Sequence, residues 1–320
     1  MSLQSSLSRR GTFAVNLPAA TQGTALVLIS AVGFGTMSIF AKTAYAAGAN
    51  VPTTLFLRFL LASVLLWGGL AATGRVRFGL SARQVLVCVA LGAIGYAAMS
   101  LAFFSALEYV PASLASLVLY TYPPVVTLLA FILLREGLDG RKCLALAAAA
   151  LGLMLVLGIG TGAVRGVGVV LALVASASYS AYIIAARVLL RSVPPVAASA
   201  IVIAAAGTTF GIYGAASGTL RLSMSIPAYA AIAGMAVVST VLAIGAFFAG
   251  LERVGASRAA ILSTVEPVVT LALAAAVLGE RLAPVQVAGG ACILGAVFLL
   301  HAGSGRRARP AADVSRSGET

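Results

Sequence analysis

Ten apolar segments recur along the chain, and they constrain the fold more than any other feature of the sequence. Each is about 20 residues long, the length of an α-helix that crosses a bilayer, and none alternates in the manner of a membrane β-strand. Of the 320 residues, 61% are hydrophobic and only 9% are charged, a composition typical of integral membrane proteins. We therefore predict an all-α polytopic membrane protein. The predicted spans are 23–46, 53–73, 84–107, 112–134, 143–161, 166–190, 196–216, 228–250, 256–278 and 284–302.

The segment that starts at Ala102 occurs twice. Without any gap it aligns with the segment that starts at Ala246, an offset of 144 residues. Chance matches of Ala and Leu are common in so apolar a chain, so the rarer residues carry the comparison. In this register Phe103, Phe104, Glu108, Pro123 and Glu136 meet Phe247, Phe248, Glu252, Pro267 and Glu280. The chain is therefore predicted to contain two copies of one five-helix unit, at 22–161 and 162–302, between tails at 1–21 and 303–320.

The basic residues fall mainly between the spans and orient the chain. The formal net charge is +13, and most of the 21 Lys and Arg lie on one side if the N-terminus is cytoplasmic. The opposite side holds only Lys42, Arg165, Arg221 and Arg281. The positive-inside rule then places both tails in the cytoplasm. Because the excess charge is explained in this way, a nucleic-acid partner is not expected.

Five spans per copy means that the second copy enters the membrane from the opposite face. The two predicted units are therefore inverted repeats. Such repeats around a midplane site are a recurring design of secondary transporters, in which a bundle alternates between two access states.

Matching prolines lie at the centres of the fourth and ninth predicted spans. They are Pro123 and Pro124 in the first copy and Pro267 in the second. A proline inside a helix leaves an earlier carbonyl group without its donor, so both helices should bend there. Tyr122 precedes the first bend and Glu266 precedes the second, so the two copies differ chemically at this point.

Glu266 is the only acidic residue deep inside a predicted span. A charged side chain at the bilayer centre costs on the order of 3 kcal/mol, so its carboxyl group should be protonated, face a wet cavity or have a cationic partner. The functional interpretation is a proton-coupling or substrate-amine site. The structural alternative is an acid held by hydroxyl groups of a neighbouring helix.

Arg58 lies within the second predicted span, where the register places Val202 in the other copy. It is a candidate to hold a substrate carboxylate; alternatively it pairs with an acid or extends to the lipid headgroups. Tyrosines near the middle of the spans are candidates to line a central cavity. The candidate cavity-lining tyrosines are Tyr120, Tyr122, Tyr179 and Tyr182.

Glu136 and Glu280 end the fourth and ninth predicted spans. A carboxylate at the C-terminus of a helix opposes the local dipole. We therefore expect each to have a partner across the loop or on another helix, in a structural turn.

Signals for other kinds of chemistry are missing from the sequence. Neither a phosphate-binding loop nor a catalytic triad is visible, and the cysteines and the histidine lack the spacing of metal ligands. Cys88, Cys143 and Cys292 lie inside or at the edge of apolar spans and are expected to be small core residues. We predict no cofactor, no metal and no enzymatic activity.

Several of these segments resemble the EamA family of the drug/metabolite transporter superfamily. The resemblance rests on the two five-helix halves, on residues 55–59 (LFLRF) and on the doubled segments 123–136 and 266–280. It implies ten helices, cytoplasmic termini and export of small metabolites or drugs. The sequence Tyr122-Pro123-Pro124 in the first half has no identical counterpart in the second half, so a symmetric binding site is not expected.

The leading hypothesis is a secondary exporter in the inner membrane that works by alternating access, with protons as the candidate coupling ion. Its substrates would be amino acids, related amphipathic compounds or drugs. Two alternatives remain open from the sequence: a membrane scaffold or assembly partner without transport activity, and an enzyme that acts on lipid.

Overall fold

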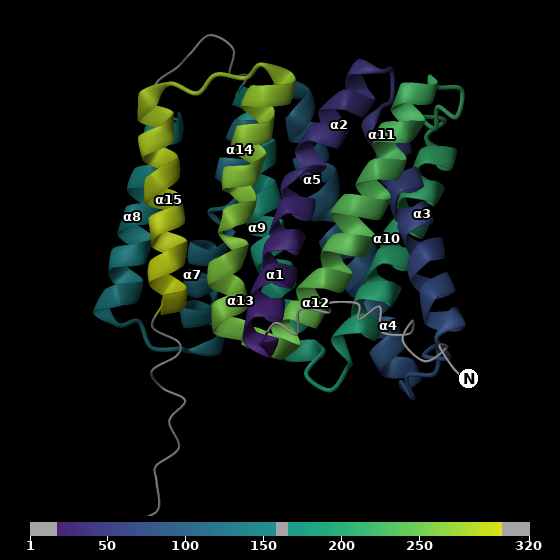
Figure 1. Ribbon diagram of the computed structural model, residues 1–320, viewed down its shortest axis with the longest axis horizontal. Coiled ribbons are helices and arrows are strands. Elements are labelled where there is room, and N and C mark those ends of the chain that lie inside the picture. The colour runs from purple at the N-terminus through teal and green to yellow at the C-terminus, as the bar shows by residue number, and fades with distance from the viewer. Residues whose placement is uncertain (1–17, 158–165, 303–320) are drawn as a thin grey trace, which may run out of the picture.

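The computed structural model describes residues 18–157 and 166–302, and in these ranges the chain forms ten helical spans (Figure 1). Each span is long and apolar enough to cross a membrane. The predicted all-α polytopic fold with two inverted five-helix repeats is confirmed. Most of the predicted tails, residues 158–161 of the fifth predicted span and Arg165 lie outside the described residues.

The first repeat contains three spans that are divided into shorter helices. Its elements are α1 (Ala19–Gly35) and α2 (Met37–Ala46) in span 1, α3 (Val51–Ala72) in span 2, α4 (Ala82–Ala90), η1 (Leu91–Tyr96) and α5 (Ala97–Tyr109) in span 3, α6 (Ala112–Leu119) and α7 (Tyr122–Leu134) in span 4, and α8 (Gly140–Leu157) in span 5. We call the end of the bundle at which α1 begins the lower end, and the end at which α2 ends the upper end (Figure 1).

The second repeat follows the same plan from the opposite end. Its elements are α9 (Gly166–Leu189) in span 6, α10 (Pro195–Ala216) in span 7, α11 (Ile226–Ala236), η2 (Val237–Leu242) and α12 (Ala243–Val254) in span 8, α13 (Ala256–Ser263) and α14 (Val265–Leu278) in span 9, and α15 (Pro284–Ala302) in span 10.

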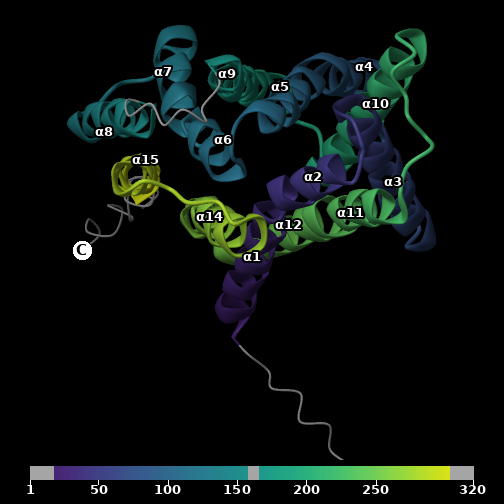
Figure 2. The same ribbon diagram turned by 90° about the horizontal axis from the view of Figure 1, so that it is seen from above.

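Helix packing shows the twofold relation between the repeats. Helix α1 packs on α12 and α14, and its counterpart α9 packs on α5 and α7, which are the equivalents of those two helices. Helices α3 and α10 pack on each other, as do α8 and α15. Figure 2 shows these two self-paired contacts at opposite edges of the bundle. The interior between them is formed jointly by both repeats.

Thr36 interrupts span 1, whereas the equivalent span 6 is one continuous helix. The Thr36 hydroxyl group donates to the Gly33 carbonyl oxygen at 2.6 Å and lies 2.8 Å from the hydroxyl oxygen of Ser239 in η2. A threonine that bonds to the preceding turn competes with the helical backbone bonds. The upper part of span 1, α2, thereby packs against α5 and α6.

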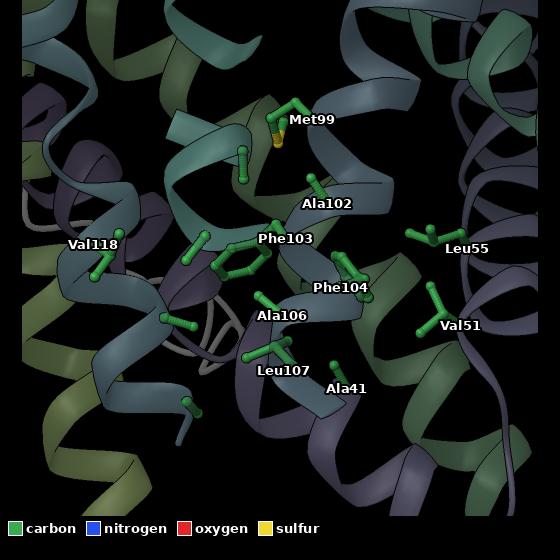
Figure 3. Packing of buried hydrophobic residues seen from close by; sticks show 14 of the residues in the cluster. Ala41, Val51, Leu55, Met99, Ala102, Phe103, Phe104, Ala106, Leu107 and Val118 are labelled. Carbon is green, nitrogen blue, oxygen red and sulfur yellow. The ribbon is translucent and has the colours of Figure 1, made fainter. Parts of the chain in front are cut away.

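A buried apolar cluster closes the upper half of the bundle. Figure 3 shows its centre on α5, where Phe104 faces Val51 and Leu55 of α3. Phe103 is 5% exposed and Phe104 is 1% exposed. Residues of both repeats contribute to this cluster, so it holds the two halves together at this end.

The crossing of α8 and α15 depends on two glycines. A Cβ atom on Gly152 would lie 2.6 Å from the carbonyl oxygen of Gly289, and one on Gly289 would lie 2.7 Å from the carbonyl oxygen of Gly152. Small residues of this kind let the backbones of membrane helices approach closely.

All three cysteines are free. Cys88 is buried, as expected for a residue of an apolar span, and Cys292 is partly buried. Cys143 is exposed, against expectation, because it lies in the first turn of α8 beside the surface residues Arg141 and Lys142.

Candidate functional site

Spans 4 and 9 are interrupted at equivalent positions. Helix α6 ends at Leu119 and α7 begins at Tyr122, while α13 ends at Ser263 and α14 begins at Val265. The prolines lie just after each interruption, in the first turn of the new helix. Amide groups of a first turn have no intrahelical partner, so proline is tolerated there.

The break in span 9 places Glu266 in the first turn of α14. A carboxylate at a helix N-terminus is stabilised by the helix dipole, by about 0.3–1 kcal/mol, and this partly offsets the cost of a carboxyl group at this depth. The Glu266 side chain is half-buried and lines a cavity. Its carboxyl group also lies within hydrogen-bonding reach of the Tyr120 hydroxyl group.

Two cavities meet at Glu266. The lower cavity has a volume of about 330 Å³ and extends toward Ser199 and His301 at the lower end. The upper cavity has a volume of about 130 Å³ and reaches Arg58 and Phe104. Six residues line both, and we call them the waist. The waist consists of Phe34, Tyr96, Tyr120, Tyr122, Tyr179 and Glu266.

Three tyrosines of the waist and Tyr182 of the lower cavity form a continuous chain of ring contacts. The ring centroids of Tyr120 and Tyr122 are 5.8 Å apart, those of Tyr122 and Tyr179 are 4.7 Å apart, and those of Tyr179 and Tyr182 are 6.1 Å apart. Edge and offset contacts at such distances are favourable. The electron-rich faces of tyrosine rings attract cations, so this wall and Glu266 favour a positively charged group.

Hydrogen bonds from neighbouring spans hold the interrupted backbone in place. The Tyr120 hydroxyl group donates to the carbonyl oxygen of Ser263 at 3.3 Å, which joins the two breaks directly. The Ser180 hydroxyl group donates to the carbonyl oxygen of Tyr122 at 3.2 Å, and Thr270 donates to the carbonyl oxygen of Gly35 at 3.0 Å. The carbonyl groups of Ser263 and Gly35, which lie at interruptions, are thus partnered across repeats.

Arg58 borders the upper cavity and is 1% exposed. Its Nε donates to the Thr240 hydroxyl oxygen at 3.1 Å, and its guanidinium carbon lies 4.7 Å from the Phe59 ring centroid and 5.2 Å from that of Phe104. Arg58 therefore does not extend to the lipid headgroups, and within the described residues it has no acidic ion-pair partner. An anionic group in the upper cavity would meet this guanidinium.

The structure brings most of the predicted site residues together. Glu266, Tyr120, Tyr122 and Tyr179 belong to the waist, whereas Tyr182 lines the lower cavity and Arg58 the upper one. Pro123, Pro124 and Pro267 are buried behind the waist and line neither cavity.

Sequence reasoning missed several lining residues. The pair Phe247–Phe248 lines the lower cavity, and its match to Phe103–Phe104 was a signal that both pairs have related places in the bundle. Phe34 and His301 also line it. Neither carries such a signal, because one apolar residue among many and a residue at the end of a span do not reveal their orientation.

Comparisons with known proteins agree with this architecture. The model of the EamA-like transporter family matches the chain twice, at residues 21–158 and 166–302. The chain is 30% identical over 295 residues to "Uncharacterized transporter YcbK" of Bacillus subtilis (strain 168), over 89% of this chain and 93% of the relative. A solved crystal structure has the same fold, with a TM-score of 0.62 and 18% identity, over 88% of this chain and 96% of the other.

Both the family model and the relative are described as transporters, in accord with ten apolar helices around a central cavity. The chain is thus a multi-pass membrane transporter that belongs to the EamA-like transporter family.

Proposed function

We propose that this transporter is a secondary exporter of small amphipathic metabolites, such as amino acids and their derivatives, and that protons are its coupling ion. The observation that carries the proposal is the position of Glu266 at the junction of two cavities, of which the upper one is also lined by Arg58. A carboxyl group and a guanidinium that border one small space are complementary to the amine and the carboxylate of an amino acid.

The size of the site supports a small substrate. Pockets for drug-sized ligands measure about 300–1,000 Å³, and the lower cavity, at about 330 Å³, is at the bottom of that range. The upper cavity, at about 130 Å³, has room for the polar head of such a molecule, while its side chain would lie among the tyrosines.

Charge distribution supports export. Exposed arginines gather at the lower end, among them Arg75, Arg77, Arg187 and Arg191, so the positive-inside rule makes the lower end cytoplasmic. The cavity extends toward this end and would load substrate from the cytoplasm of a cell whose inner membrane holds the protein. Both termini lie on that side in this topology.

Coupling follows from competition for one carboxyl group. Glu266 would bind either a proton or the substrate amine, because a single carboxylate at the waist cannot satisfy both. The substrate would then leave toward the upper face as a proton enters from it. Tyr120, which reaches the Glu266 carboxyl group, would orient it in both states.

Reconstituted vesicles test the proposal. Wild-type protein should exchange radiolabelled amino acids across the bilayer at a rate that depends on the pH gradient. The variant Glu266→Gln keeps the size of the side chain but loses the charge, and should lower the rate by about tenfold or more, as for loss of a charge-assisted hydrogen bond. Its residual exchange should not respond to pH.

Glu252→Gln is the matched control, because Glu252 is exposed at the lower end and lines neither the upper nor the lower cavity. It should transport at the wild-type rate. Equal flux through Glu266→Gln and wild-type vesicles at every pH would contradict the coupling role of Glu266 and leave facilitated diffusion.

A further inference from the structure

Glu280 joins the upper ends of the two repeats. Its carboxylate oxygens accept hydrogen bonds from the backbone amides of Ala112 at 2.7 Å and Ser113 at 3.0 Å, and from the Ser113 hydroxyl group at 2.6 Å. These groups form the start of α6, whose own N-cap residue, Pro111, makes no side-chain cap. A residue of the second repeat therefore caps a helix of the first.

Glu136, the equivalent residue of the first repeat, has a different partner at the lower end. It forms an ion pair of 2.6 Å with Arg187 of span 6, in which the side chains are 35% and 54% exposed. By the 144-residue register, the helix that Glu136 would cap is α13. The N-cap of α13 is Gly255, and it provides no side-chain cap.

The local backbone presents both carboxylates in the same way. Arg135 and Gly279 adopt left-handed conformations, with φ of 54° and 67°. The following amide, of Glu136 or Glu280, then bonds back to the carbonyl oxygen of Ala130 at 3.2 Å or of Ala274 at 3.1 Å. The turns that hold the two glutamates have the same backbone geometry, and the glutamates differ only in the groups that lie close to their carboxylates.

The distance between helices explains the difference in reach. Helix α6 packs closely on α14 at the upper end, whereas the equivalent helices α13 and α7 have at most marginal contact. The lower cavity borders α13 at that end, where it is lined by Ala260 and Ser263. Closing the lower end would bring Glu136 toward the start of α13, as Glu280 now lies on the start of α6.

We propose that Glu280 and Glu136 are the two gate residues of the transport cycle. Glu280 holds the upper end closed by capping α6, and Glu136 leaves Arg187 and caps the backbone amides of α13 when the lower end closes. The assignment rests on the alternating access of the proposed function. One cap forms as the other breaks, so each state keeps one of the two caps.

The two interactions of Glu136 differ in strength, and this makes the assignment testable. Exposed ion pairs contribute little, whereas a carboxylate on backbone amides at a helix N-terminus combines charge-assisted hydrogen bonds with the dipole. Removing the Glu136 carboxylate should therefore harm the lower-closed state more. Removing Arg187 should instead release Glu136 for that state.

The experiment measures access to the cavity from each face, without any substrate. A background that lacks Cys88, Cys143 and Cys292 receives one reporter, Ser116→Cys in the upper cavity or Ser199→Cys in the lower. A membrane-impermeant maleimide is then added to either face of sealed cells or vesicles. With Glu280 intact, Ser199→Cys should react readily from the lower face and Ser116→Cys slowly from the upper face.

Glu280→Gln should increase the labelling rate of Ser116→Cys from the upper face by about tenfold, as expected for loss of charge-assisted bonds. Ser113→Ala removes only one of the three bonds and should give a smaller increase, which provides a milder variant if Glu280→Gln folds poorly. Glu108→Gln is the matched control, since Glu108 is exposed at the same end, and should leave the rate unchanged.

At the lower end the gate assignment predicts opposite signs. Arg187→Gln should raise labelling of Ser116→Cys from the upper face, and Glu136→Gln should lower it. A purely structural pair would respond equally to loss of either member. Shifts of the same sign would therefore overturn the role of Glu136.

The two proposals fail in different ways. If the reporter in the intact gate reacts slowly from the upper face and Glu280→Gln leaves that rate unchanged, the gate assignment is wrong while alternating access stands. If Ser116→Cys reacts from the upper face in no variant, alternating access itself is overturned, and the gate assignment with it.

Discussion

Two phenylalanine pairs at equivalent positions of the repeats have different surroundings. Ring centroids are 5.9 Å apart in Phe103–Phe104 and 5.8 Å apart in Phe247–Phe248, with interplanar angles of 77° and 66°. The first pair is buried in the apolar cluster of the upper half, whereas the second is partly exposed along the lower cavity. Both pairs border a cavity, but the first is enclosed beside the small upper cavity, whereas the second is partly exposed along the larger lower one.

Replacing one phenylalanine of each pair by alanine should reveal the largest difference in stability between the two ends. Phe104→Ala should lower the free energy of unfolding by about 3 kcal/mol or more, because a fully buried ring leaves a cavity. Phe248→Ala should cost far less, since its ring already borders open space. Thermal unfolding in detergent measures both, and equal losses would mean that the two ends are packed alike in solution.

A second comparison concerns the contact between α8 and α15. By the register, Gly152 is equivalent to Ala296, and Gly289 is equivalent to Ala145. The two glycines contact each other, and the two alanines pack in one buried cluster at the lower end. Gly152→Ala should destabilise the protein by about 2 kcal/mol, because the nearest atom to its Cβ would be a backbone carbonyl oxygen, which cannot turn aside as a side chain can. Ala296→Gly should cost about 1 kcal/mol, the helix propensity of alanine over glycine.

The same thermal unfolding assay separates these two variants. If Gly152→Ala proved as stable as the wild-type protein, the backbones of α8 and α15 would have to lie farther apart than in this structure. A larger loss for Ala296→Gly than for Gly152→Ala would reverse the comparison and place the tighter contact at the lower end.

The smallest expected effects concern the C-caps of spans 4 and 9. Gly279→Ala should cost about 1 kcal/mol, because a side chain disfavours the left-handed conformation. Arg135→Gly should be neutral or stabilising by less than about 1 kcal/mol, since it relieves that strain but loosens the unfolded chain. Unfolding midpoints that fall for both variants would show that the Arg135 side chain stabilises its turn by other contacts.

Much of the fold was predictable because the apolar segments are separated by polar turns. Spans 4, 9 and 10 were predicted with the observed ends, and most other helix ends differ by a few residues. The 144-residue offset between the repeats could be found because rare residues, such as Pro123 and Glu136, recur as Pro267 and Glu280. The site was partly predictable for the same reason, since an acid such as Glu266 is conspicuous in an apolar span.

Other features depend on tertiary contacts that no local pattern encodes. The interruption at Thr36 involves Ser239, about two hundred residues away, and the equivalent Ser180 lies in an unbroken helix. The partners of Glu280 likewise come from the other repeat. The two ends of the bundle have similar sequences, so the sequence does not determine which end is closed. That depends on the conformation.

The π-helical segments η1 and η2 occur in the third span of each repeat, at Leu91–Tyr96 and Val237–Leu242. A π-bulge adds one residue to a helix, and one residue corresponds to about 100° of rotation. In a residue-by-residue reactivity scan along span 3 or span 8, the periodic maxima will slip out of phase at these turns. A single helical wheel drawn for the whole span will therefore assign the residues beyond the π-helical segment to the wrong face of the helix.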